Sequence, residues 1–267
     1  MFTDKRSSWP IVYPDRGHPE HVDWHRSCVR SRPTTLCDSL TAVSHTRASR
    51  FNGLEFVLVI GIAFGHFIVF SIASLLAGPG PDDHMFDNGH LAYLLVYESI
   101  AGSIVALILW RNGWRLHDFK LQPSLTATGQ GVGLACAGWL VYYLAAIIAR
   151  AAFGGMLGDR ISEDDHLVLG GAAPLMVLLV SLLNPLFEEI LACSYVIEAL
   201  RSRLGVVAAI NVSTALRVSY HVYQGPFAFL WVAMLGLLFA YAYVKWRRLW
   251  PVVVAHSIHD FVALSLV

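Results

Sequence analysis

Long apolar runs follow one another from Leu54 to the end of the chain, and they restrict the possible folds more than any other feature of the sequence. A helix rises about 1.5 Å per residue, so about 20 apolar residues cross the hydrocarbon core of a bilayer. Because lipid offers no hydrogen-bond partners, a backbone that crosses it must form a helix or a closed barrel. Runs of this length predict an all-α, polytopic transmembrane helical bundle.

We expect about seven spans in this bundle. Breakers separate them, such as Gly78-Pro79-Gly80-Pro81 after the first run and Gln224-Gly225-Pro226 before the sixth. The predicted spans are Leu54–Ala77, Leu91–Trp110, about Gly131 to Phe153, about Gly170 to Leu200, Gly205–His221, Pro226–Val244 and Trp250–Val267.

The composition agrees with a membrane protein. Hydrophobic residues make up 56% of the chain and charged residues only 14%, against about 25% charged in an average globular domain. The formal net charge is zero, so no basic excess indicates a nucleic-acid partner, and we expect the lipid bilayer to be the chain's main surroundings. The four cysteines have neither zinc-site nor redox spacing, which predicts free thiols.

The first 50 residues differ from the rest, because they are polar and have no apolar periodicity. They lack the apolar core of a signal peptide, so we interpret them as a disordered leader before a membrane domain at residues 51–267. Lys and Arg gather in the leader and in alternate loops, and acidic residues in the loops between. The positive-inside bias therefore predicts a multi-pass protein with the leader and the basic loops on the cytoplasmic side.

Ionisable residues are concentrated in the second half of the predicted bundle. A charged side chain at the centre of a bilayer costs about 2.5–3.5 kcal/mol, so such residues normally face the protein interior and have a function. The first three spans offer only Glu55, His66 and Glu98, and we expect the last two to make polar contacts within the bundle. The later spans carry Glu188, Glu189, Arg217, His221, His256, His259 and Asp260.

The spacing of these residues predicts one shared site. Arg217 and His221 are four residues apart, as are His256 and Asp260, so each pair lies on one helical face. Neighbours on a helix differ by about 100° in direction, so Glu188 and Glu189 should have different roles. We expect Glu188, His221, His256 and Asp260 to converge on one internal cavity, with His259 packing outside it.

Three segments of the last 100 residues or so resemble the motifs of the CAAX-protease and bacteriocin-processing (CPBP) family, which are EExxxR, FxxxH and HxxxN or HxxxD. They are Glu188-Glu189-Ile-Leu-Ala-Cys193, Arg217-Val-Ser-Tyr-His221 and His256-Ser-Ile-His-Asp260. The resemblance implies an intramembrane endopeptidase with a membrane protein or peptide as substrate. Cys193 replaces the family's arginine and Arg217 its phenylalanine, so we hypothesise that Arg217 restores the lost cation and pairs with Glu189.

The resemblance also implies a role for each residue of the predicted site. Glu188, the first of the two paired carboxylates, would be the general base that takes a proton from water, and His221 would hold that water. His256 and the residue four positions later would stabilise the oxyanion. Asp260 can donate only when protonated, so we favour the alternative that it orients the His256 ring.

The sequence leaves the cofactor undecided between none and a divalent metal such as zinc. Two histidines and a carboxylate are a plausible zinc set, and the ligands would then be Glu188, His221 and His256. The chain contains no HExxH motif, and water activated by glutamate alone would explain the same residues.

Two other functions fit parts of the pattern. The departures at Cys193 and Arg217 are also consistent with a catalytically impaired family member that acts as an immunity or membrane-protein assembly factor. A transporter or proton relay would place Glu, His and Arg in the membrane as well. A transporter, however, usually shows repeat symmetry, and here the polar residues gather in one half of the chain.

Overall fold

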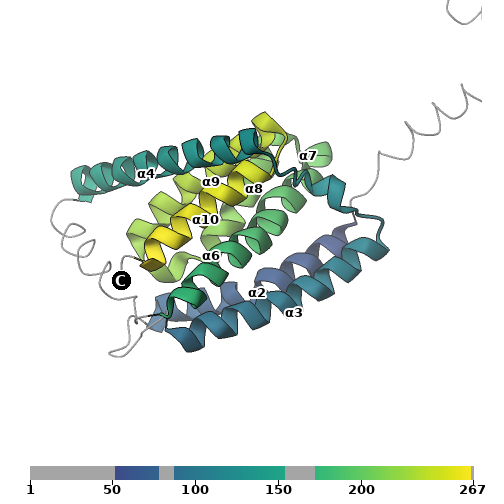
Figure 1. Ribbon diagram of the computed structural model, residues 1–267, viewed down its shortest axis with the longest axis horizontal. Helices are drawn as coiled ribbons and strands as arrows, with labels where there is room; N and C mark the ends of the chain where they lie inside the picture. Colours follow the sequence, from purple (N-terminus) through teal and green to yellow (C-terminus); the bar gives the residue numbers. More distant parts are fainter. Residues whose placement is uncertain (1–51, 78–86, 154–171, 266–267) are drawn as a thin grey trace, which may run out of the picture. The chain divides into compact units, whose positions relative to one another are not determined.

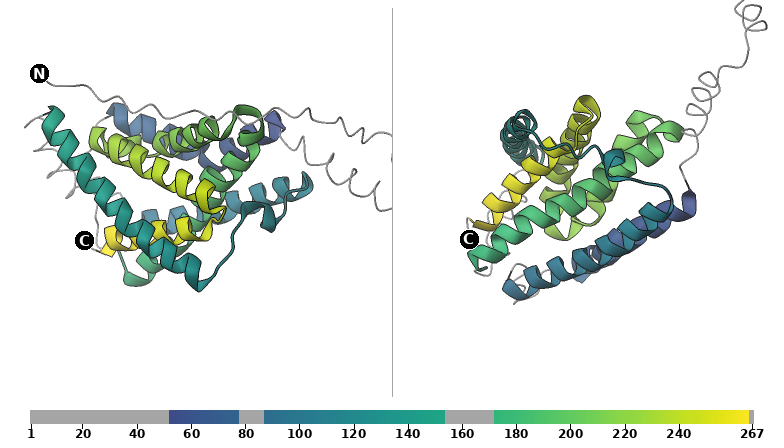
Figure 2. Two further views of the ribbon diagram at one scale, coloured as in Figure 1. Left: turned by 90° about the horizontal axis from the view of Figure 1, so that it is seen from above. Right: turned by 45° about the vertical axis from the view of Figure 1, so that its right-hand side comes forward.

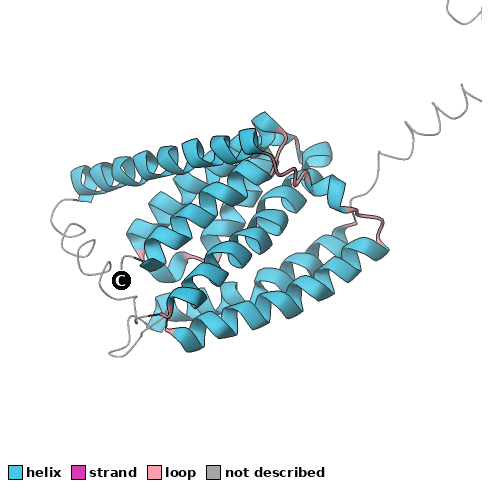
Figure 3. Cartoon of the chain, viewed as in Figure 1, coloured by secondary structure: helices cyan, strands magenta, loops and turns pink. Residues whose placement is uncertain are grey.

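The structure, a computed structural model, describes residues 52–77, 87–153 and 172–265, and these ranges contain helices and loops but no strand (Figure 3). The described part therefore confirms the predicted all-α bundle. In chain order the helices are α2 (Gly53–Ala77), α3 (Asn88–Arg111), η1 (Leu116–Phe119), α4 (Leu125–Phe153), α6 (Pro174–Glu188), η2 (Glu189–Tyr195), α7 (Val196–Leu204), α8 (Val206–Ser219), η3 (Val222–Gln224), α9 (Pro226–Trp246) and α10 (Trp250–Ser265).

Every predicted span corresponds to a helix, but they differ in length. Within the described ranges, five helical segments are long and apolar enough to cross a membrane: α2, α3, α4, the continuous segment from α6 to α7, and α9. With 14 and 16 residues, α8 and α10 are shorter than the roughly 20 residues of a full crossing. The chain is thus a helical integral membrane protein. Within the described residues, five of the seven predicted spans are full-length, and α8 and α10 correspond to the other two.

Some predictions concern segments that lie outside the described residues. These are the disordered leader at residues 1–50, its boundary with the membrane domain, the breaker at 78–81 and the acidic loop at 163–165. They stay predictions.

The α6–η2 segment contacts both of the other helices that carry predicted site residues. Helix α6 packs against α3 and α10, and η2 packs against α8 (Figures 1 and 2). Helix α8 in turn contacts α7 and α9, and α4 covers α9 and α10. Residues far apart in the sequence are therefore gathered around the end of α6.

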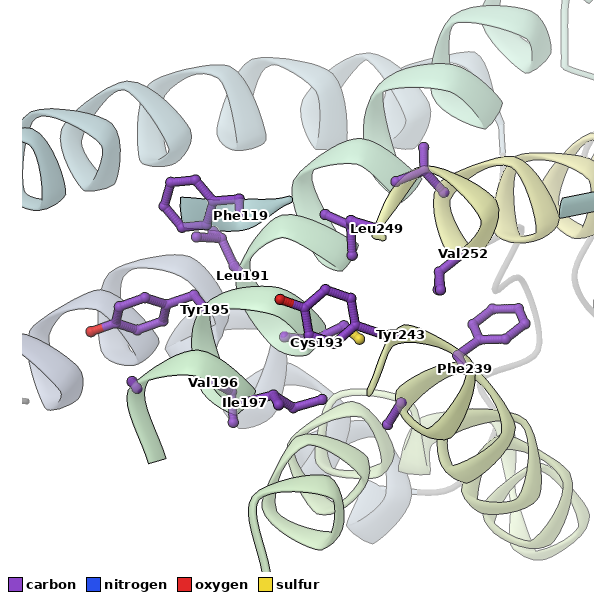
Figure 4. Close-up of a cluster of buried hydrophobic side chains, with 14 of the residues drawn as sticks. Phe119, Leu191, Cys193, Tyr195, Val196, Ile197, Phe239, Tyr243, Leu249 and Val252 are labelled. Carbon is purple, nitrogen blue, oxygen red and sulfur yellow. The ribbon is translucent and has the colours of Figure 1, made fainter. Parts of the chain in front are cut away.

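A tightly packed apolar cluster surrounds η2 and holds it in place (Figure 4). Leu191, Cys193 and Tyr195 of η2 lie in it, beside Phe239 and Tyr243 of α9. Cys193 is a buried free thiol, whereas Cys136 is an exposed one. The position where the family has arginine thus belongs to the core, as expected for an inert thiol.

Close packing between α4 and α10 leads to a first prediction. A Cβ atom on Gly131 would lie 2.6 Å from the Val254 Cβ and 2.8 Å from the Pro251 carbonyl oxygen. Because that oxygen belongs to the backbone, it cannot move aside easily. We expect Gly131→Ala to lower the free energy of unfolding by about 1–3 kcal/mol, the usual cost of overpacking.

The measurement is unfolding in mixed detergent micelles, followed by far-ultraviolet circular dichroism. Gly133→Ala is the matched control in the same helix, since no atom lies within 4 Å of its added Cβ. The control should be at least as stable as the parent, because alanine restricts the unfolded chain more than glycine does. Equal stability of the two variants would contradict the packing argument.

Candidate active site

A wide turn of helix begins at the second glutamate of the Glu188–Glu189 pair. Pro185 lies inside α6 and lacks an N–H, so the Ser181 carbonyl loses its usual helical donor. The chain then continues as a π-helical segment, η2, from Glu189 to Tyr195. Such segments occur mostly as single turns within α-helices and often at functional sites. The Ser213 hydroxyl of α8 donates to the Ala192 carbonyl at 2.6 Å, which fixes α8 against this turn.

Glu189 is the centre of a buried ionic network that joins three helices. Its side chain is fully buried, and its Oε1 atom accepts hydrogen bonds from Arg217 Nη2 at 2.6 Å and from His256 Nδ1 at 2.7 Å. Its other oxygen, Oε2, is buried and has no hydrogen-bond partner among the described residues. The predicted pairing of Arg217 with Glu189 is therefore present, and one oxygen of Glu189 is bonded to both Arg217 and His256.

Glu188 has different surroundings from its neighbour. Its side chain keeps 8% exposure, and its Oε2 atom accepts a hydrogen bond of 2.7 Å from the Tyr220 hydroxyl. Arg217 Nη1 lies 3.4 Å from the same oxygen, so one guanidinium contacts both glutamates. No group of the described residues donates to Glu188 Oε1. This oxygen is the one that remains available for a water molecule.

The Arg217 side chain is enclosed on its other side as well. Its guanidinium carbon lies 5.8 Å from the centre of the Phe239 ring, within the range of a cation–π contact. Helix α9 also approaches closely at Gly236, where an added Cβ would lie 3.1 Å from Thr214 Cγ2 and 3.4 Å from Arg217 Cδ. Arginine at this position therefore has a partner on every side, although the family motif has phenylalanine there.

His221 follows the last turn of α8 and is partly exposed. Its Nδ1 atom lies 2.9 Å from the carbonyl oxygen of Arg217. A carbonyl oxygen only accepts, so Nδ1 carries the proton, and in the neutral ring Nε2 is left as an acceptor. His221 is thus attached to the network through the backbone of Arg217 and keeps one ring nitrogen for another partner.

His256 and Asp260 lie on one face of α10, as their spacing predicts. The two nitrogens of His256 face different carboxylates: Nδ1 is bonded to Glu189, and Nε2 is 3.3 Å from Asp260 Oδ1. The Asn184 amide of α6 donates to Asp260 Oδ2 at 3.1 Å. Asp260 therefore accepts contacts on both oxygens, which is the arrangement of an orienting carboxylate.

Direct contacts join Glu188, Glu189, Arg217, His256 and Asp260 into one network, and His221 is bound to its edge. His259 lies apart from them and packs edge-on against Trp139 at 5.3 Å between ring centres. Tyr220 and Phe239 belong to the site but were not predicted. Tyr220 could have been noticed as the neighbour of His221 one turn after Arg217, whereas Phe239 lies on a helix without any motif.

An apolar cavity of about 580 Å³ lies beside the site, between α3, η1 and the α6–η2 segment. Phe187 and Ile190, which flank the two glutamates in sequence, are part of its wall, and Gly102 and Val105 form the side from α3. The two glutamates are not part of the wall, so the cavity adjoins the site only through their sequence neighbours.

The arrangement of donors does not fit a metal ion. No group of three His, Cys, Asp or Glu side chains in the described ranges is arranged to hold one. Of the three conditional ligands, Glu188 is hydrogen-bonded to Tyr220 and close to the positive Arg217, and His256 has carboxylates at both nitrogens. The mechanism below therefore contains no step through a metal.

Residues 170–262 match the family model described as type II CAAX prenyl endopeptidase Rce1-like. The matched segment contains all six residues of the predicted site. No curated protein and no solved structure matches the chain.

The ionic network predicts strong coupling between Arg217 and Glu189. Removing one partner of a buried ion pair costs about 3–5 kcal/mol, because a charge is left without compensation. In a double-mutant cycle of Arg217→Met and Glu189→Gln, we expect a coupling energy of about 1–3 kcal/mol. The free energies of unfolding in detergent micelles provide the measurement.

A second cycle combines Arg217→Met with Glu55→Gln and serves as the control. Glu55 is also buried in the bundle, but its carboxylate binds Trp114 at 2.9 Å and Tyr195 at 3.1 Å. Its effect should add to that of Arg217→Met. Additivity in the first cycle as well would show that the pair is not coupled.

Proposed function

We propose that this chain, whose segment 170–262 belongs to the Rce1-like family of type II CAAX prenyl endopeptidases, is an intramembrane endopeptidase that uses water activated by Glu188. The observation that carries this proposal is the difference between the two glutamates. Each glutamate has one oxygen without a donor among the described residues, but Glu189 has 0% exposure and is bonded to Arg217 and His256, whereas Glu188 keeps 8% exposure. A general base needs a free lone pair within reach of its water, and Glu188 Oε1 is the better placed of the two to meet one.

In the proposed reaction a water molecule lies between Glu188 Oε1 and His221 Nε2. Glu188 takes one proton from it while the water oxygen forms a bond to the carbonyl carbon of the substrate. The Tyr220 hydroxyl and Arg217 fix the carboxylate through its other oxygen, so that Oε1 stays directed at the water. Holding the reacting groups in this way removes much of the entropic cost of bringing them together.

The oxyanion that forms on the carbonyl needs a hydrogen-bond donor in place before the reaction. His256 is suited to this role because two carboxylates favour its protonated form. The Nδ1 bond to Glu189 is 2.7 Å long, whereas the Nε2 contact with Asp260 is 3.3 Å. Nε2–H is therefore the more weakly held donor, which the oxyanion can share. Asp260, fixed by Asn184, sets the direction of the ring.

The position of Arg217 favours an enzyme over the impaired relative. The argument for impairment rests on the loss of the motif arginine at Cys193. Arg217 supplies a guanidinium to both glutamates from the neighbouring helix. The charge that the motif requires is thus present, although it comes from a different position in the sequence.

The substrate in this proposal is a membrane protein or peptide, and the apolar cavity beside the site supports an apolar group near the cleaved bond. We further propose that the basic loops face the cytoplasm. Lys120 and Arg247 come from two of these loops, and both lie within 3.5 Å of Glu198, which is one turn before Arg201 on α7. Their common position supports placing these loops on one side of the membrane.

Glu188→Gln is expected to abolish cleavage without unfolding the protein, because the amide has the same shape but cannot accept the proton. His221→Ala should lower the rate nearly as much. The assay follows a fluorescence-quenched peptide with a prenylated cysteine near its C-terminus in proteoliposomes, at equal amounts of folded protein. Glu55→Gln makes the same chemical change outside the site and should leave the rate unchanged. Full turnover in Glu188→Gln would remove the general-base assignment.

Asp260→Asn distinguishes an orienting carboxylate from a protonated donor. If Asp260 orients His256, the amide loses the charge that holds the ring, and kcat should fall about 10- to 100-fold, the scale for such partners at metal sites. If Asp260 donates to the oxyanion, asparagine would donate without needing a proton, and activity would hold or rise at alkaline pH. We expect the fall. A pH–rate profile of the variant that stays level with the parent through the alkaline limb would assign the donor role instead.

A further inference from the structure

One buried acid beside the site belongs to none of the motifs. Glu98 lies on α3 with 6% exposure, in a stripe of buried residues that also contains Leu91, Ala101, Val105 and Leu109. One turn further on, a Cβ atom at Gly102 would lie 3.4 Å from the Phe187 ring, so this face of α3 packs on α6 immediately before Glu188. Glu98 therefore lies one turn from the contact between α3 and the segment that carries Glu188.

Glu98 and Glu188 also lie at a similar depth along their helices. As many residues separate Glu98 from the basic Arg111 at the end of α3 as separate Glu188 from Arg201 on the α6–α7 segment. At about 1.5 Å per residue both glutamates lie about 20 Å from these basic ends. Glu98 is therefore level with the proposed general base.

The surroundings of Glu98 favour a neutral carboxyl group, chiefly because its side chain is buried in a membrane-spanning helix. The acidic Glu188 and Asp260 act in the same direction, and His256 acts against them. Its Oε2 atom is buried and has no hydrogen-bond partner among the described residues. His256 already faces Glu189 and Asp260, so it does not compensate a further negative charge. An ionised carboxylate left without a cation in the membrane interior is costly, whereas a protonated one is not.

We propose that Glu98 holds a proton and donates it to the leaving amine, so that it forms an acid–base pair with the ionised Glu188. Two carboxyl groups in surroundings of different charge, one protonated and one ionised, are a recurring solution for hydrolysis. The inference rests on the proposed endopeptidase function and adds the residue that protonates the leaving group. In the motif-based mechanism that proton would have to come back from Glu188, because His256 is engaged by the oxyanion and by two carboxylates.

The proposed step is balanced in atoms and charge. Glu188 takes a proton from water, and the hydroxide oxygen bonds to the carbonyl carbon, whose π electron pair moves to the oxygen. As that pair returns, the C–N bond breaks, and its electrons go to the nitrogen, which takes the proton of Glu98. The products are an amine and a carboxylic acid, with Glu188 protonated and Glu98 ionised. Transfer of the proton from Glu188 to Glu98 restores the starting state.

Glu98→Gln tests the donor role, because glutamine fills the same space but has no acidic proton. We expect kcat to fall about 100-fold or more, within the range for general acid catalysis, with KM unchanged. Glu98→Asp, which keeps the acid on a shorter side chain, should recover part of the rate. The control is Ser99→Ala, since the exposed Ser99 hydroxyl binds only the Leu95 carbonyl of its own helix, and its rate should equal that of the parent.

The protonation of Glu98 can be measured without any substrate. Infrared spectra of the protein in liposomes at neutral pH show the carbonyl stretch of a protonated carboxyl group apart from the carboxylate and amide bands. We expect such a band in the parent and in Ser99→Ala, shifted in D2O, and its loss in Glu98→Gln. Identical carboxyl bands in the parent and Glu98→Gln would mean that Glu98 is ionised, and would overturn the proposal whatever the assay gives.

The outcomes separate the two proposals. If the parent cleaves peptide and Glu98→Gln cleaves it at the same rate, the donor role is wrong, while Glu188 keeps its assignment. If the purified parent cleaves none of the peptides, the endopeptidase function fails, and the donor role fails with it. A slow Glu98→Gln variant that also lacks the infrared band supports both.

Discussion

The buried contact of Arg217 with Glu188 and Glu189 holds together the part of the structure on which everything else depends. Adjacent carboxylates in the interior of a membrane bundle repel each other and lose their hydration. One guanidinium that contacts both, at 3.4 and 2.6 Å, offsets this cost. The arginine is itself desolvated, so it binds α8 to η2, and the His256 contact with Glu189 adds α10. The contacts that compensate the charges of the glutamates are thus also the contacts that join the three helices.

The network also makes the two glutamates unequal, and this inequality is the basis of the proposed chemistry. Cations occupy Glu189, and a tyrosine hydroxyl occupies one oxygen of Glu188. The π-helical turn that starts at Glu189 changes the course of the helix at this point, where two neighbouring side chains meet different partners. In a regular α-helix the two side chains would differ only by the usual rotation of about 100° per residue.

The same network shows how the chain can differ from the family motif and still have an arginine beside the two glutamates. When the sequence is compared with the family motif, Cys193 stands in place of the arginine, and this difference argues against activity. In this structure a cation does contact both glutamates, but it comes from Arg217 on an adjacent helix. Cys193 is then free to pack in the apolar cluster around η2 (Figure 4). The same view applies to Glu98, for which we propose a role in the reaction although its helix carries no motif.

The sequence alone determined the helical membrane architecture, because run length and hydropathy decide whether a segment can cross lipid. It also determined which residues share a helical face, such as His256 and Asp260, since the helical period is fixed. Only the tertiary structure decided which faces meet. Tyr220 contacts Glu188, and the face of α3 that carries Glu98 packs against α6, because of how α8 and α3 are rotated and how deep they lie. Side-chain packing sets this rotation and depth. The π-helical turn also depends on packing, which no local pattern contains.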